Sequence, residues 1–180
     1  MNTDEHRLHV RQLSAAEGRE NLGALADVLV DCVEGGASVS FMTPFPKSAA
    51  EEFFEKILIE VEAGGRILLA AFDGSRLVGT VQIVTALPPN QPHRADVAKL
   101  LVLRSARGQG VATLLMRSAE ECARECNKAL LVLDTVTGGD AERLYQRLGW
   151  TKAGVIPNYA LYPDGRFCDT TIFWKQLPDA

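Results

Sequence analysis

The chain has 180 residues, of which 47% are hydrophobic and 23% are charged, and its 19 basic and 23 acidic residues give a formal net charge of −4. The apolar fraction excludes a disordered chain, and the mild acidity argues against a dedicated nucleic-acid binder, which would carry an excess of Lys and Arg. This length predicts one domain, residues 1–180, whose core needs neither disulfides nor a metal.

No run of about 18 consecutive apolar residues is present, so no membrane partner is expected. Residues 1–7 are polar and lack the apolar segment of a signal peptide, which predicts a cytoplasmic protein. The four cysteines form no CxxC pairs. Cys122 and Cys126 share one face of an expected helix without further ligands nearby, so we expect both to be buried as small apolar residues and no metal to be bound.

The first half of the chain predicts helices that begin at capping boxes, one alternating strand and a strand that is a compact apolar run. Its expected elements are a strand at 8–13, a helix from the Ser14 capping box to about Glu34, a helix from the Ser48 capping box to Gly64, and strands at 67–72 and 77–87 joined by a hairpin turn at Asp73-Gly74.

The second half predicts a strand–helix–strand unit followed by a hairpin. Its expected elements are a strand at 95–103, a helix after the glycine-rich turn at 107–110, a strand at 129–133 that is apolar enough for burial on both faces in a parallel pairing, a helix at 141–148, and strands near 150–161 and 167–177. This order predicts an α/β fold with one mixed sheet and helices on both faces.

The strongest chemical pattern is the glycine-rich turn between a strand and a helix. The N-terminus of a helix offers unpaired N–H groups and a partial positive charge, and glycines let phosphate oxygens approach the backbone. Arg104 and Arg107 add positive charge. The turn therefore favours phosphate binding, although a tight turn that needs glycine for its own geometry would look the same.

Two common phosphate-binding patterns fit poorly. The GxxxxGK[ST] loop is absent. A dinucleotide fingerprint would use Gly108 and Gly110, with Asp134 on the ribose, but Thr113 stands at the position of its third glycine. Only one clear strand–helix–strand unit is present, whereas a dinucleotide-binding fold needs several.

A third interpretation rests on resemblance. Arg107-x-x-Gly110-x-Ala112 is similar to the [Q/R]-x-x-G-x-[G/A] motif of the GNAT acyltransferases, and residues 141–150 resemble the A-x-x-L-Y-x-x-x-G-F segment of that family. The resemblance extends over nearly the whole chain and implies the GNAT fold, with a mostly antiparallel sheet. Within the family, short segments resemble the tabtoxin-resistance acetyltransferases, namely residues 35–39, 94–97, 105–108, 133–135 and 163–166.

The resemblance implies acetyl-CoA as cosubstrate. The acyl-CoA would lie between two diverging strands, with its pyrophosphate on the glycine-rich turn and its pantetheine arm along the preceding strand. One backbone N–H of that strand would also polarise the thioester carbonyl. The implied binding residues are Leu101, Val102, Leu103, Arg107, Gly108, Gln109, Gly110, Val111, Ala112 and Thr113.

Direct attack by an amine needs proton acceptors and donors but no enzyme nucleophile. By resemblance, Tyr145 is the general acid near the sulfur, and Asp96 and Asp134 are candidates for the general base or for binding the substrate ammonium. Asp96 stands where the tabtoxin-resistance pattern has a longer Glu, which favours a water relay. Gly138 replaces an Asn that commonly helps to hold pantetheine in the family, so that contact must come from elsewhere or be missing.

The acceptor pocket is expected between the connection of the first two helices and the last hairpin, with Phe41, Phe45, Asn158, Tyr159 and Tyr162 as candidates. The resemblance implies an N-acetyltransferase for a small-molecule primary amine, amino-acid-like or an antibiotic or toxin. A peptide or protein amine is the second acceptor class, and an acyl-CoA-binding sensor without catalysis is a different class of protein. A homodimer through the last hairpin stays open.

Overall fold

A computed structural model of the protein describes residues 8–178; the polar segment 1–7, on which the cytoplasmic prediction partly rests, lies outside them. Seven strands form one sheet in the order β1-β2-β3-β4-β5-β7-β6. Neighbouring strands are antiparallel except β4 and β5, which are parallel. The strands are β1 (Leu8–Leu13), β2 (Arg66–Asp73), β3 (Arg76–Val84), β4 (Arg94–Val102), β5 (Leu130–Val136), β6 (Thr151–Leu161) and β7 (Phe167–Gln176).

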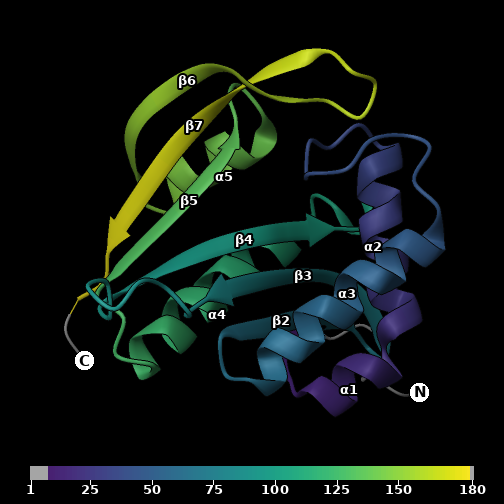
Figure 1. Ribbon diagram of the computed structural model, residues 1–180, viewed down its shortest axis with the longest axis horizontal. Coiled ribbons are helices and arrows are strands. Elements are labelled where there is room, and N and C mark those ends of the chain that lie inside the picture. Colours follow the sequence, from purple (N-terminus) through teal and green to yellow (C-terminus); the bar gives the residue numbers. More distant parts are fainter. Residues whose placement is uncertain (1–7, 179–180) are drawn as a thin grey trace.

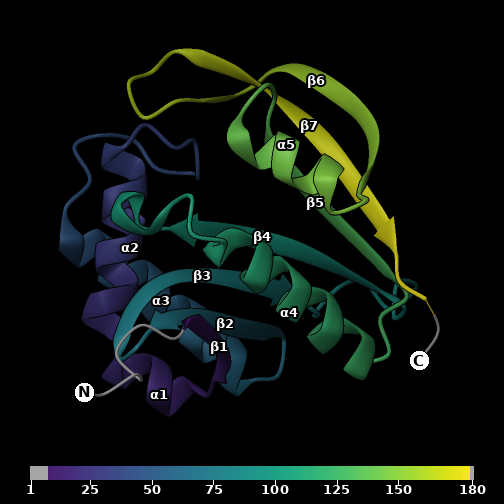
Figure 2. The same cartoon turned by 180° about the vertical axis from the view of Figure 1, so that it is seen from behind.

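Helices cover both faces of this sheet, as the sequence predicts. Figure 1 shows α2 and α3 in front of β2, β3 and β4, and Figure 2 shows α4 and α5 on the opposite face. The helices are α1 (Ala15–Glu20), α2 (Leu22–Glu34), α3 (Lys47–Glu62), α4 (Val111–Glu125) and α5 (Asp140–Arg147), with a short 3₁₀ helix at Arg104–Ala106. The expected mixed, mostly antiparallel architecture is therefore confirmed.

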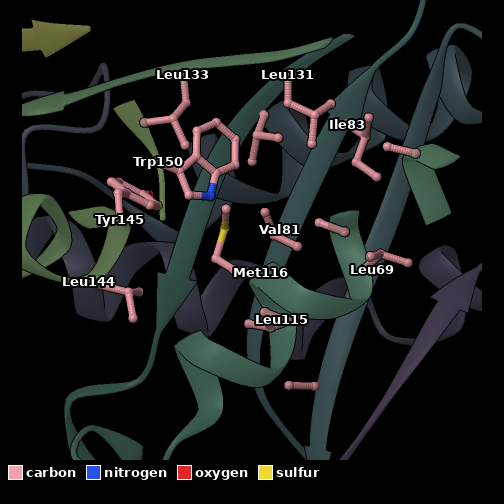
Figure 3. Packing of buried hydrophobic residues seen from close by; sticks show 14 of the residues in the cluster. Leu69, Val81, Ile83, Leu115, Met116, Leu131, Leu133, Leu144, Tyr145 and Trp150 are labelled. Atoms are coloured by element: carbon pink, nitrogen blue, oxygen red, sulfur yellow. The ribbon is translucent and has the colours of Figure 1, made fainter. Parts of the chain in front are cut away.

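The apolar residues form two cores, one on each side of the sheet. The core under α1, α2 and α3 includes Leu25, Leu29 and Phe54, all fully buried. The core under α4 and α5 includes Met116 and Leu133, together with Tyr145 and Trp150 (Figure 3). Because Tyr145 belongs to this second core, the packing of α5 fixes the position of its ring.

Two helix boundaries differ from the prediction. The first predicted helix breaks at Asn21, whose side chain donates to the Glu17 carbonyl oxygen at 2.8 Å and so competes with helical hydrogen bonding. The capping box at Ser14 is present, but the one at Ser48 is not. There Pro46 is the N-cap and its carbonyl oxygen accepts the first bonds of α3, so Ser48 lies inside the helix.

The strand β5 pairs in parallel with β4 as predicted, but it is not buried on both faces. Leu131 and Leu133 are buried, whereas Leu130 and Val132 are only partly covered. The two partly covered side chains alternate with the buried ones and therefore point to the opposite face, where no helix lies over β5 (Figure 1). The front of the sheet at β5 is thus accessible beside the helices that cover β4.

Candidate active site

The site begins where β4 and β5 separate. The two strands pair only from Arg94 to Asp96, opposite Leu130 to Val132. Beyond that point β5 stays on β7 and β4 stays on β3, and Figure 1 shows the two strands running apart. Asp96 ends the paired segment and Asp134 follows it on β5. The predicted V-shaped divergence is therefore present, with one candidate carboxylate on each arm.

A β-bulge in β4 accompanies this divergence. Lys99 and Leu100 together stand opposite the single residue Val81 of β3. Lys99 has φ of 52°, in the left-handed region. Such a bulge bends the strand and increases its twist. The bulge therefore adds to the separation of β4 from β5, which begins directly after Asp96.

The glycine-rich turn opens the N-terminus of α4. Gly108 and Gly110 have φ of 75° and 85°, which a residue with a side chain adopts only with strain. Gly110 is the N-cap, and no side chain caps the first turn of the helix. A Cβ atom built on either glycine would have nothing within 4 Å. The turn therefore leaves N–H groups of the first helical turn facing open space, a geometry that suits an anion.

The two arginines of this turn are in different environments. The Arg104 Nε donates to Asp31 Oδ1 at 2.9 Å and its backbone N–H donates to Oδ2 at 2.7 Å. Burial acts to raise the pKa of Asp31, but these bonds and the nearby guanidinium groups outweigh it and lower that pKa. Arg104 is thus paired, and Arg107, whose Nε donates to the Val102 carbonyl oxygen at 3.3 Å, is the better source of positive charge for a ligand.

Fewer backbone N–H and carbonyl groups at the end of β4 are available to a ligand than the sequence predicts. The N–H of Leu103 donates to the Val78 carbonyl oxygen at 2.9 Å, and its carbonyl oxygen accepts from Ala106. Both backbone groups of Leu103, which is expected to pair with pantetheine, thus have partners within the protein. Since peptide groups alternate along a strand, Leu101 also faces β3, whereas Val102 faces away from it. The N–H of Val102 is therefore the donor of this segment that points toward the diverging side.

Tyr145, the candidate general acid, belongs to the core under α4 and α5. Its ring is only 5% exposed and packs against Trp150 and Phe173, each at a centroid distance of 5.9 Å. Burial, and secondly the charge of Asp134, raise the pKa of Tyr145 above its usual range. The hydroxyl is therefore protonated at neutral pH and close enough to Asp134 for their charges to interact.

The two candidate carboxylates have different partners. Asp96 accepts from Arg94 Nη1 at 2.8 Å, and its side chain is 37% exposed. Burial raises the pKa of Asp96, the charge of Asp134 adds to this, and Arg94 opposes it. Asp134 is exposed and accepts a hydrogen bond from Thr170 Oγ1 at 3.0 Å. Among residues 8–178, Asp134 is thus held in place by a neutral donor and forms no direct ion pair, whereas Asp96 pairs with Arg94.

The loop between α2 and α3 meets the hairpin of β6 and β7, as expected for the acceptor pocket. Ser38 Oγ donates to the Leu161 carbonyl oxygen at 2.7 Å, and Thr43 donates from its N–H and its hydroxyl to that of Pro163. Figure 1 shows the tip of this hairpin next to the loop. These hydrogen bonds join the loop to the hairpin, although the two segments are about 120 residues apart along the chain.

The aromatic candidates for this pocket have unequal surroundings. The Phe41 ring lies tilted against Phe45 at a centroid distance of 4.5 Å and meets Phe53 of α3 edge to face at 5.2 Å, so Phe41 anchors the loop to α3. Tyr162 lines a cavity of about 220 Å³ at the junction of loop and hairpin. Tyr159 is 54% exposed, and Asn158 has φ of 51° with its N–H bonded to Asp169. Tyr159 and Asn158 lie on the exposed strand β6 rather than between the two aspartates.

Sequence reasoning missed Lys99 and Ser40. The Lys99 Nζ donates to Ser40 Oγ at 2.9 Å, and electrostatic interaction with Asp134 places this ammonium in the site. The only local signal was a lysine near the middle of a mostly apolar strand, which alone is uninformative. Gly138, which departs from the family pattern, has φ of 79° and donates its N–H to Glu142.

Within residues 8–178 no group of His, Cys, Asp and Glu side chains is arranged to hold a metal ion. Cys122 is partly covered and Cys126 is exposed at the end of α4, so the predicted burial of Cys126 is wrong. Over the same range, no helix combines the length and apolar character that crossing a membrane requires.

Comparison with known proteins gives one family match and many similar folds. Residues 35–150 match the model of the acetyltransferase (GNAT) family. YncA of Salmonella typhimurium, solved with its cofactor acetyl-CoA, is 18% identical and has a TM-score of 0.76, with 96% of this chain and 95% of that chain covered.

Two further structures differ in the acceptors that their names state. A proposed phosphinothricin N-acetyltransferase is 18% identical with a TM-score of 0.77, covering 96% of this chain and 100% of that chain. The ribosomal-protein-alanine N-acetyltransferase of Brucella melitensis is 22% identical with a TM-score of 0.77, covering 94% and 99%. At these identities the likeness shows a shared fold.

Proposed function

The chain belongs to the acetyltransferase (GNAT) family, and on that premise we propose that it transfers the acetyl group of acetyl-CoA to a primary amine of a small molecule by direct attack. The observation that carries this proposal is the uncapped N-terminus of α4, opened by two left-handed glycines at the end of the strand that has left its neighbour. One anion-binding turn and two carboxylates on diverging strands match a reaction between an anionic cosubstrate and a cationic amine.

The cosubstrate would be held mainly by backbone groups. The N–H groups of residues 108–113 would bind the pyrophosphate, with Arg107 adding charge from the edge of the turn. The glycines fit this role because a Cβ at Gly108 or Gly110 would project into the space that the phosphates need. The free N–H of Val102 would then bind the pantetheine arm, as the paired Leu103 does not.

The chemistry requires that the amine loses a proton, that charge on the thioester oxygen is stabilised and that CoA leaves as a thiolate. Asp134 suits the amine better than Asp96, because Thr170 holds it in place and, within residues 8–178, it forms no direct ion pair of the kind that Asp96 forms with Arg94. The raised pKa of Tyr145 keeps its hydroxyl protonated. Since such a phenol is a weaker acid than a thiol, we assign Tyr145 a hydrogen bond to the departing sulfur rather than complete proton transfer.

The acceptor is proposed to be amino-acid-like or an antibiotic or toxin amine, in line with the resemblance to the tabtoxin-resistance acetyltransferases. One structural neighbour is named for phosphinothricin and another for a ribosomal protein, so a peptide or protein amine is the second candidate. The hydrogen bonds between the hairpin and the α2–α3 loop close the site on that side. This favours a small molecule over a protein as the acceptor.

Thiol release from acetyl-CoA tests the proposal across free amino acids, polyamines, aminoglycosides, β-lactam amines and short peptides. We expect turnover with at least one small amine. Stoichiometric CoA binding without turnover on any amine would instead identify an acyl-CoA sensor. Asp134→Asn and Asp96→Asn then distinguish the two carboxylates. Loss of the general base should lower kcat by about 100-fold or more and make kcat depend more strongly on pH.

Three wider features belong to the same proposal. All described strands lie in one sheet, so we treat the chain as one GNAT domain. The cytoplasm, as the source of acetyl-CoA, is its expected location. The edge strand β6 exposes Val155, Ile156 and Tyr159, so a homodimer through the last hairpin is the state to test by light scattering.

A further inference from the structure

Lys99 and Ser40 form an unusual pair at the point where β4 leaves β5. Lys99 has φ of 52° and Ser40 has φ of 83°, so both are non-glycine residues in the left-handed region. Their side chains are joined by the 2.9 Å bond from Nζ to Oγ, although they are 59 residues apart. Strained backbone of this kind persists where the surrounding structure enforces it, and it clusters at ligand sites.

The ammonium of Lys99 has one hydrogen bond within the described chain and the charge of Asp134 nearby. It has three N–H donors, and Ser40 Oγ is its one hydrogen-bond acceptor among residues 8–178. Burial lowers the pKa of Lys99, Asp134 opposes this shift and Arg66 adds to it. A partly buried ammonium with a single neutral acceptor is stabilised when an anion binds beside it.

The neighbouring polar groups also supply donors rather than acceptors. Arg66 is occupied, since its Nε pairs with Glu60 at 2.7 Å and its Nη1 donates to Gln82 Oε1 at 2.7 Å. Gln82 Nε2 is buried and has no hydrogen-bond partner within the described chain. Gln82 pairs in register with Ala98, directly before Lys99. This part of the site therefore carries positive charge and an unused N–H donor.

The acids of the site are Asp96 on β4 and Asp134 on β5. A ligand that matches this arrangement carries an ammonium for the aspartates and an anionic group for Lys99. We propose that Lys99, positioned by Ser40, binds the carboxylate of the acceptor, so that the acceptor is a zwitterionic amine of the amino-acid type rather than a polyamine or aminoglycoside. This inference rests on the proposed acetyltransferase function and adds the residue that selects the acceptor.

The test compares acceptors that differ only in the carboxylate. Each amino acid that releases thiol is paired with its decarboxylated amine, and kcat/KM is measured for both. We expect the wild type to prefer the amino acid by about 10- to 100-fold, the range of one charge-assisted hydrogen bond. Lys99→Met should remove most of this preference by lowering kcat/KM for the amino acid. The kcat/KM for the decarboxylated amine should stay within about 3-fold of wild type.

Two variants control the interpretation. Lys99→Arg retains the charge and should restore part of the preference, whereas Lys56→Met removes an exposed lysine of α3 and should leave it unchanged. The KM for acetyl-CoA should stay constant in all three. If Lys99→Met loses kcat/KM equally with both acceptors, Lys99 has a structural role and the inference is overturned. A wild type that shows no preference for the amino acid would also overturn it. So would a wild type that acetylates only polyamines or aminoglycosides.

A binding measurement separates this inference from the proposed function. If no amine is acetylated, the proposed function fails, but the CoA-loaded protein can still be titrated with N-acetyl amino acids and with the matching N-acetyl amines. Weaker binding of the carboxylates to Lys99→Met than to wild type would support the subsite on its own. Equal affinities for the two ligand series, or no binding of either to wild type, would overturn it.

Discussion

Gly110→Ala gives the sharpest test of the cosubstrate site. The variant places a side chain at φ of 85°, which costs about 1–2 kcal/mol for an L-residue in the left-handed region. For a chain of this size, that lowers Tm by about 2–8 °C. The new Cβ meets no protein atom within 4 Å, so no clash inside the fold adds to this cost. It stands instead over the first turn of α4, where the pyrophosphate is proposed to bind.

The expected loss of affinity follows from the bonds that this Cβ would block. A hydrogen bond to a charged group contributes about 1.5–3 kcal/mol, so losing one such bond weakens CoA binding by about 10- to 150-fold. Calorimetric titration with CoA measures the affinity, and differential scanning calorimetry measures Tm.

Gly64→Ala is the matched control, because Gly64 has φ of 75° and also has nothing within 4 Å of a built Cβ, but it follows α3 rather than the turn. Both variants should lose similar stability, and only Gly110→Ala should lose affinity. If CoA binds both variants equally well, the pyrophosphate does not lie on this turn.

Three further outcomes are expected. Tyr145→Phe keeps the ring in its core and should leave Tm within about 2 °C, but lower kcat by about 10- to 100-fold in a thiol-release assay; an unchanged kcat would remove the hydroxyl from the reaction. Gly79→Ala puts a Cβ 2.8 Å from the Leu101 carbonyl oxygen and should destabilise the fold by about 1–3 kcal/mol in urea unfolding, and a neutral effect would contradict the observed β3–β4 spacing. The Gly138 N–H lowers the pKa of Glu142 below its ordinary value of 4.5. The ionised Glu142 carboxylate therefore stabilises the fold above that pH, and this contribution is lost as the pH falls further. The stability difference between wild type and Glu142→Gln should therefore shrink from pH 7 to pH 4, and a constant difference would refute this assignment.

Most of the fold could be predicted because its elements are specified locally. Residues 67–72 are a compact apolar run typical of a strand, and the Asp73-Gly74 turn that joins them to 77–87 sets an antiparallel register that the structure confirms. The parallel pairing of β5 with β4 was also predicted, although the burial on both faces that the apolar run predicted is absent. The break at Asn21 was not, because it depends on one side chain that competes for a helical carbonyl.

The site was predictable where chemistry lies within one motif and unpredictable where it depends on distant segments. Tyr145 and the glycine-rich turn belong to continuous motifs. By contrast, Asp31 neutralises Arg104 from 73 residues away, and this ion pair could not be found in the turn sequence. Lys99 meets Ser40 only because a bulge turns its side chain toward the α2–α3 loop, and nothing in the residues 95–103 marks which position carries that bulge.

The β4 bulge affects both the proposed cosubstrate site and the proposed acceptor site. Because two residues of β4 stand opposite Val81, the strand turns from β5 and frees the backbone at Val102 for a cosubstrate. The same extra residue brings Lys99 to Ser40 and sets its charge across from Asp134. A deletion that restored regular pairing would therefore disturb both ligands together, whereas Gly110→Ala and Lys99→Met each affect one. The local charges of opposite sign, rather than the net charge of −4, are then what select a zwitterionic acceptor beside an anionic cosubstrate.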